Sequence, residues 1–176
     1  DWSSDVCSSD LPAQPVPEHL FSSATLAELI VDLRETMHGH QGAGLAAPQI
    51  GVPLRVVIAE VQRNPRYPQA EPFTEIVLIN PKISPLGEER QAGWEGCLSV
   101  PGLRGRVERW QQIQVDWRDV TGDAHRETVQ GFKARVLQHE CDHLDGVLFP
   151  DRLDDQRAFG FIPELEAAGL IPSVPS

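Results

Sequence analysis

Apolar residues recur at three- and four-residue steps between residues 22 and 38. They are Leu26, Leu29, Ile30, Leu33 and Met37. Residues at this spacing lie on one face of an α-helix. Ser22 or Ser23 can cap the first turn, and Gly39 provides a stop signal. The pattern predicts an amphipathic helix that packs its apolar face against the rest of the fold.

Other parts of the chain have the β-branched composition or the alternating pattern that is typical of β-strands. Residues 55–61 and 75–80 are short β-branched runs and predict strands. Between them, residues 62–72 hold three prolines and predict an exposed loop, and residues 81–91 predict a second irregular connection. Residues 112–118 alternate apolar and polar side chains and predict a strand. Residues 121–123 predict a turn, and residues 126–130 predict a second strand that runs back along the first. This part predicts a β-hairpin.

A second helix is predicted from about Phe132 to Leu144 and is followed by Gly146, a typical residue just past a helix end. We expect residues 147–149 to form a short strand and residues 159–165 to add one helical turn. Residues 11–17 contain three prolines and should be extended. The serine-rich residues 1–10 predict a disordered or non-native leader, so we expect one domain over residues 11–176 with a short C-terminal tail.

Composition excludes several classes of protein. The chain has 176 residues, 40% of them apolar, enough for one domain with one core. Its formal net charge of −11 argues against nucleic-acid and anionic-membrane binding, since both need a basic surface. No apolar run approaches the ~20 residues that span a bilayer, and no signal-peptide pattern is visible, which predicts a cytoplasmic protein. Arg104, Arg106 and Arg109 form a local cluster that could receive an acidic group or could be ordinary surface charge.

The second predicted helix contains the motif His139-Glu140-Cys141-Asp142-His143. Its two histidines are four residues apart, so they lie on one face and can hold one metal ion. Glu140 would lie beside the metal and could take a proton from a metal-bound water, as in metallohydrolases. A helix with two histidines at this spacing by chance is the alternative.

A catalytic metal of this type needs a third protein ligand. The metzincin pattern would require histidine at position 149, where this chain has Phe149, and Cys141 projects to another side of the helix. His125 is a weak candidate. Cys97, flanked by glycine outside any periodic apolar segment, is a better one, and the Leu98 N–H beside it could donate to an oxyanion. Three cysteines in total do not suggest a disulfide framework.

Residues 42–51 are rich in small side chains, which allow another backbone to approach closely. Gln49 adds an amide that can donate to a developing oxyanion. A tight turn between a helix and a strand is the alternative, and the glycine spacing does not match a phosphate-binding loop.

Residues 42–49, 95–99 and 138–143 read GAGLAAPQ, EGCLS and QHECDH. In this order and at these separations they resemble the three signature motifs of the peptide deformylases, and the similarity extends from about Leu11 to Leu153. The resemblance implies an α+β fold with mixed, largely antiparallel sheets around a central metal-binding helix. It also implies hydrolytic removal of the formyl group from the N-terminal formyl-methionine of newly synthesised polypeptides, with release of formate.

The resemblance implies roles for individual residues as well. Cys97, His139 and His143 would bind one metal ion, and Glu140 would be the general acid and base for a metal-bound water that attacks the formyl carbon. Gln49 and the Leu98 N–H would stabilise the oxyanion. The backbone near Ala43 and Gly44 would pair with the substrate, and Arg104 would line the groove beyond the methionine pocket. The resemblance implies Fe²⁺, although the ligand set equally permits Zn²⁺, Ni²⁺ or Co²⁺.

The expected partner is a formyl-methionyl nascent peptide at the ribosome exit, with no direct contact to nucleic acid or membrane. Two alternatives stay open at this point. A metalloprotease-like peptidase would cleave internal bonds, and a metal-dependent binding protein would have lost catalysis. Glu140 and Gln49 argue against the second alternative, because binding alone needs neither.

Overall fold

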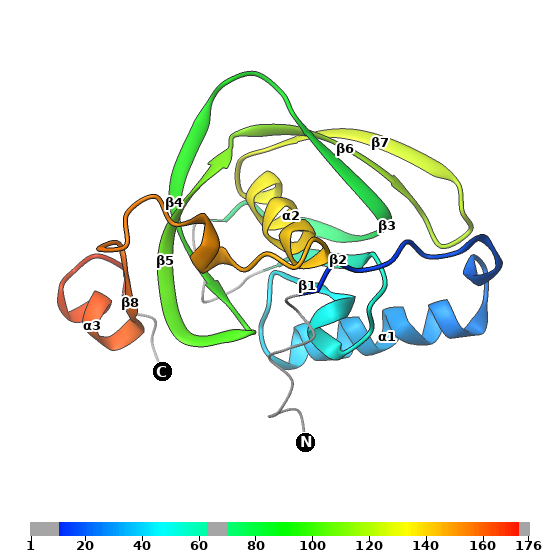
Figure 1. The fold of residues 1–176 in the computed structure, drawn as a ribbon, viewed down its shortest axis with the longest axis horizontal. Coiled ribbons are helices and arrows are strands. Elements are labelled where there is room, and N and C mark those ends of the chain that lie inside the picture. The colour runs from blue at the N-terminus through cyan, green and yellow to red at the C-terminus, as the bar shows by residue number, and fades with distance from the viewer. Residues whose placement is uncertain (1–10, 63–69, 173–176) are drawn as a thin grey trace.

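Helix α2 (Gly131–Leu144) lies at the centre of the fold, flanked by two antiparallel sheets (Figure 1). This computed structural model describes residues 11–62 and 70–172, so the predicted leader at residues 1–10 lies outside the described part. The larger sheet has the strand order β1-β2-β3-β6-β7 and the smaller sheet the order β4-β5-β8. The α+β prediction with a central helix is confirmed.

The larger sheet is formed by β1 (Gly44–Ala46), β2 (Val56–Val61), β3 (Phe73–Pro85), β6 (Gln112–Arg118) and β7 (Ala124–Gln130). The smaller sheet is formed by β4 (Arg90–Cys97), β5 (Val100–Trp110) and β8 (Phe159–Phe161). The pairs between these strands are antiparallel. A parallel bridge joins Gln14 to Leu54 and holds the extended N-terminal segment against the sheet.

The two long helices cover opposite faces of the larger sheet. Helix α1 (Ala24–Gly39) begins as predicted at Ser23, whose Oγ accepts the Leu26 N–H at 3.1 Å. Its apolar face packs in one cluster with Leu45, Ile58 and Ile79, whereas α2 packs in another with Ala46, Val57 and Leu78. Strand β2 is therefore covered on both faces, which explains its continuous apolar sequence.

The irregular connection predicted over residues 81–91 is confined to residues 86–89 in the structure. Strand β3 continues to Pro85, and β4 begins at Arg90. Pro81 is accommodated because the register between β3 and β6 shifts between Ile79 and Lys82, and Asn80 has a positive φ of 52°. A proline can occupy a strand at such an irregularity because its missing N–H is not needed for the ladder there.

The C-terminal part also differs from expectation. The strand predicted at residues 147–149 is absent, and a 3₁₀ turn, η4 (Phe149–Arg152), forms with Pro150 in its first turn. Residues 159–165 form β8 and the start of α3 (Ile162–Ala167) instead of one helical turn. The predicted hairpin is confirmed as β6 and β7, and Gly146 follows α2 with a φ of 71°.

The predicted loop at residues 62–72 lies partly outside the described residues. Two further 3₁₀ turns, η2 (Glu18–Leu20) and η3 (Ala47–Ile50), flank α1 and β1 along the chain. None of the helices in the described ranges combines the length and apolar character that crossing a bilayer requires.

Candidate metal centre and active site

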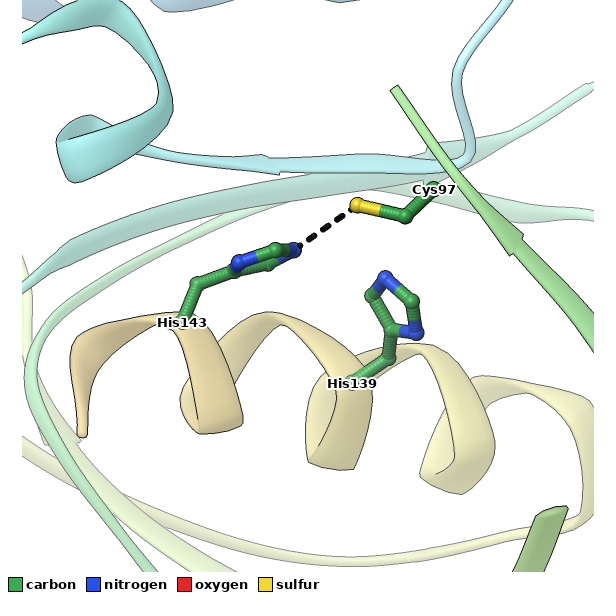
Figure 2. Close-up of side chains that lie close together, drawn as sticks. All are labelled: Cys97, His139 and His143. Atoms are coloured by element: carbon green, nitrogen blue, oxygen red, sulfur yellow. Dashed lines mark hydrogen bonds between the residues drawn. The ribbon is translucent and has the colours of Figure 1, made fainter. Parts of the chain in front are cut away.

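Cys97, His139 and His143 converge from two elements, and one potential ligand atom of each lies within 4.8 Å of the others (Figure 2). The histidines come from one face of α2, with ring centroids 5.2 Å apart. Cys97 ends β4 at a tight hairpin, where it pairs with Val100, and its Sγ lies 3.2 Å from His143 Nε2. All three side chains are buried. The structure thus brings together the three residues that the sequence predicted as metal ligands.

The two imidazoles are prepared for metal binding in different ways. Burial lowers the pKa of His143 to about 3, so its ring is neutral, as a ligand must be. His139 Nδ1 lies 3.0 Å from Glu95 Oε2. Burial would lower the pKa of His139, but hydrogen bonds with Cys97 and Glu95 outweigh it and hold the pKa well above its usual range. The carboxylate fixes one proton on Nδ1, so a metal ion would bind Nε2 in place of the other proton. A thiol and two imidazoles in a buried cluster fit a divalent transition metal with one open coordination position.

Glu95 belongs to a buried ionic network. Arg109 donates to both of its oxygens, at 3.0 and 2.9 Å, and also to Asp142 Oδ2 at 2.5 Å. Arg152 donates to the other Asp142 oxygen at 2.8 Å. Burial would raise the pKa of Glu95, but the hydrogen bonds with His139 and Arg109 outweigh it and hold the pKa well below its usual range. Glu95 is therefore an anion that accepts from His139.

Glu140 lies beside this cluster in a different environment. It is 5% exposed, and its Oε2 has no hydrogen-bond partner among the described atoms. Burial raises the pKa of Glu140 to about 7. A Cβ on Gly44 would lie only 2.6 Å from Glu140 Cγ and Oε1. The glycine in β1 thus makes room for a carboxyl group poised to exchange a proton near neutral pH.

Gln49 reaches the sulfur of Cys97 from η3. Its Oε1 accepts the Ala46 N–H at 2.9 Å, which orients the amide. Its Nε2 donates to Ser99 Oγ at 3.1 Å and lies 3.7 Å from Cys97 Sγ. Leu98 follows the cysteine directly in the hairpin. Both predicted oxyanion donors therefore come from residues next to the metal cluster.

A small pocket opens beside the cluster. Its lining includes Gly44, Gln49, Cys97, Leu98, His139 and Glu140. Strand β1, which contains Gly44, is an edge of the larger sheet, and among the described strands it pairs with β2 alone. An edge strand next to a pocket offers unpaired backbone groups to an extended peptide.

Other sequence-based candidates lie elsewhere. His125 is on β7, where it stacks on Trp117 and lies 2.6 Å from Asp119 Oδ2, away from the three-residue cluster. The three arginines considered as a basic surface cluster do not form one. Arg104 and Arg109 are buried, and Arg106 alone of the three is exposed. Arg104 does not line the pocket; its side chain packs across Gly96, where a Cβ would lie 2.9 Å from Arg104 Cδ.

Sequence reasoning gave no role to Glu95, Asp142 or Arg152, and considered Arg109 only as part of a local basic cluster. Glu95 and Asp142 do lie inside the motifs EGCLS and QHECDH. A carboxylate two residues before a ligand cysteine, and another one residue before a ligand histidine, were the available signals. Their pairing with Arg109 depends on the contact between β5 and α2, which no local pattern indicates.

Comparison with known proteins identifies relatives over most of the chain. The sequence model of the polypeptide deformylase family matches residues 10–159. Peptide deformylase 1 of Prochlorococcus marinus is 55% identical over 156 residues, covering 88% of this chain and 81% of that protein. Peptide deformylase 2 of Pseudomonas syringae is 52% identical over 150 residues, covering 85% of this chain and 84% of that protein.

Solved structures agree. A Met-Ala-Ser-bound class I type b peptide deformylase from Acinetobacter baumannii superposes with a TM-score of 0.81 at 40% identity, covering 86% of this chain and 94% of that chain. The peptide deformylase of Thermotoga maritima gives a TM-score of 0.73 at 34% identity, covering 84% and 91%. The chain therefore belongs to the peptide deformylase family, enzymes that remove the formyl group from the N-terminal formyl-methionine of new polypeptides.

Proposed function

We propose that this chain hydrolyses the formyl amide of formyl-methionyl peptides with Glu140 as general acid and base, next to one metal ion held by Cys97, His139 and His143. The observation that carries this proposal is the buried carboxyl of Glu140, with one unpartnered oxygen and a pKa raised by burial to about 7, in the wall of the pocket that the three candidate ligands line or adjoin.

The donor set supports a divalent metal ion, and we propose Fe²⁺, with Zn²⁺, Ni²⁺ or Co²⁺ as possible substitutes. Such an ion would supply Lewis acidity and would lower the pKa of water towards 7. Glu95 would keep His139 in the tautomer that ligates, and burial would keep His143 neutral.

The protein residues would then divide the proton transfers and the charge between them. Glu140 would receive the proton of the attacking water and deliver it to the departing amine, which needs a carboxyl that titrates near neutral pH. Negative charge developing on the formyl oxygen would be met by Gln49 Nε2 and the Leu98 N–H. Ser99 and Ala46 already hold the Gln49 amide in place.

The peptide would lie along β1. Its backbone would pair with Ala43 and Gly44 at the edge of the sheet, and the methionine side chain would enter the adjoining pocket. A role for Arg104 further along the groove remains part of the proposal, and its packing against Gly96 places it close to the Cys97 hairpin. A cytoplasmic location and an encounter with nascent chains at the ribosome exit belong to the same proposal.

The test is formate release from matched peptides. Anaerobically purified protein of measured metal content is given formyl-Met-Ala-Ser, acetyl-Met-Ala-Ser and an unmodified longer peptide. We expect formate from the first peptide, much slower release of acetate from the second, and no cleavage of internal bonds in the third.

Cleavage of internal bonds would instead support a metalloprotease-like peptidase. Stoichiometric metal with no turnover of any peptide would support a binding protein that has lost catalysis. Either result would overturn the proposed reaction while leaving the metal site to be judged separately by its stoichiometry.

A further inference from the structure

Arg135 is a charged residue in the wall of the pocket that the proposed reaction does not use. It lies on α2 four residues before His139, so the two side chains share one face of the helix. Its side chain is only 12% exposed. A largely covered cation beside a pocket for an apolar side chain requires an explanation, because an arginine that is removed from water has to be paired.

The guanidinium of Arg135 is held at three points on the smaller sheet. Its Nη1 donates to Glu95 Oε1 at 2.7 Å and to the Val107 carbonyl at 3.0 Å. Its Nη2 donates to the Gln91 carbonyl at 2.5 Å. Because the charged head is fixed on β4 and β5, we expect the methylene stem to be the part of Arg135 that lines the pocket.

Gly93 leaves the space that the Arg135 guanidinium occupies. A Cβ at position 93 would lie 2.9 Å from Arg135 Cζ and 3.0 Å from Nη2. Gly93 lies within β4, and its φ is not in the left-handed region, so its backbone does not require glycine. The absence of a side chain at Gly93 therefore serves the arginine that packs over it.

We propose that Arg135 is a specificity-determining residue that sets the size of the pocket for the first side chain of the peptide, and that Gly93 fixes its position. This inference rests on the proposed function. An unbranched, flexible side chain such as methionine can lie along the stem. A bulky aromatic one would have to displace the head and break its hydrogen bonds to Glu95 Oε1 and to the Val107 and Gln91 carbonyls, which is unfavourable in a largely buried site.

The test compares peptides formyl-X-Ala-Ser, with X as alanine, methionine or phenylalanine, in Arg135→Ala and Gly93→Ala. The measured quantity is the ratio of kcat/KM values between two peptides in one preparation. This ratio cancels the active fraction, so partial loss of metal or of folded protein does not change it. A matched arginine control is Arg118→Ala, which removes a guanidinium bound to Glu18 and to the Gly122 carbonyl in the distant hairpin. A matched glycine control is Gly39→Ala, where a Cβ meets nothing within 4 Å.

We expect opposite shifts from the two variants. Arg135→Ala should raise the phenylalanine-to-methionine ratio by about 10-fold, within the range that pocket contacts of this size supply. Gly93→Ala should push the head towards the pocket and raise the alanine-to-methionine ratio by about 10-fold. Both controls should stay within about twofold of the unsubstituted protein.

Binding of the product peptides Met-Ala-Ser and Phe-Ala-Ser, followed by calorimetry, gives a readout independent of turnover. If the unsubstituted protein releases no formate, the proposed function fails, and the ratio of the two dissociation constants still tests Arg135. Ratios within about twofold of the unsubstituted protein in both variants would overturn the inference. If Arg135→Ala does not fold, Gly93→Ala alone decides.

Discussion

Glu140→Gln should lower turnover and, at neutral pH, relieve an energetic cost to the fold. Glutamine has nearly the same shape but cannot accept the proton of the attacking water. General acid–base steps are commonly worth about 10²–10⁴-fold, so we expect a loss of that size in kcat. The candidate ligands are unchanged, so metal content should be retained.

The stability effect follows from the pKa of Glu140, which burial raises from 4.5 to about 7. In the metal-free protein, the unfolded chain loses this proton as the pH rises through 4.5, whereas the folded chain keeps it until about 7. Stability is therefore fully present below the unfolded pKa and is lost as the pH rises through the folded pKa. At 1.36 kcal/mol per pKa unit, the loss amounts to about 3 kcal/mol.

The assay is chemical denaturation of metal-free protein at pH 5 and pH 8. The fall in unfolding free energy between these pH values should be smaller by about 2.5 kcal/mol in Glu140→Gln than in the unsubstituted protein, because part of the loss has already occurred at pH 5. Comparing the two falls cancels any pH-independent effect of the amide. Equal falls would show that Glu140 is not desolvated, and turnover within about threefold of the unsubstituted enzyme would remove it from the proposed mechanism.

Three further predictions concern the metal and the space around it. Cys97→Ser should lower metal content or change metal preference, because a hydroxyl is a harder and less acidic donor than a thiol. If Cys97→Ser left metal content and activity unchanged while His125→Ala abolished both, the proposed ligand set would be contradicted. Gly44→Ala should displace the Glu140 carboxyl, because the new Cβ would lie 2.6 Å from its Oε1. This displacement should reduce kcat by at least about 10-fold at unchanged metal stoichiometry. An unaltered kcat would refute the steric argument. The Fe²⁺ form should lose activity in air while the Ni²⁺ form keeps it, since Lewis acidity needs no redox chemistry; equal aerobic half-lives in a Cys141→Met background would instead favour a native zinc enzyme.

Cys141 itself should contribute little to inactivation by air. Its side chain is buried on α2, and burial raises the pKa of its thiol. The thiolate is the reactive form, so a thiol held protonated is a poor nucleophile and reacts slowly with oxidants.

Local patterns predicted the elements whose signals lie within a few residues. The three-and-four spacing of α1 and its Ser23 cap, the hairpin of β6 and β7, and the face shared by His139 and His143 all follow from helix and strand periods. The β3 extension was missed because Pro81 reads as a breaker, and only the register irregularity against β6 makes it tolerable.

By itself the sequence determined the fold class, the central helix and the set of residues able to hold a metal, because each is carried by a short pattern or by three motifs in order. Only the tertiary structure decided that Cys97 reaches His143, that Glu95 binds His139 and two arginines, and that Gly44 leaves room for Glu140. Most of these contacts join residues 40 or more positions apart, and Glu95 and Arg109 are 14 positions apart on two different strands. Burial decides whether an arginine such as Arg109 is surface charge or part of an ionic network. Such pairings depend on how the sheets pack around α2, which is a property of the whole chain and of no local segment.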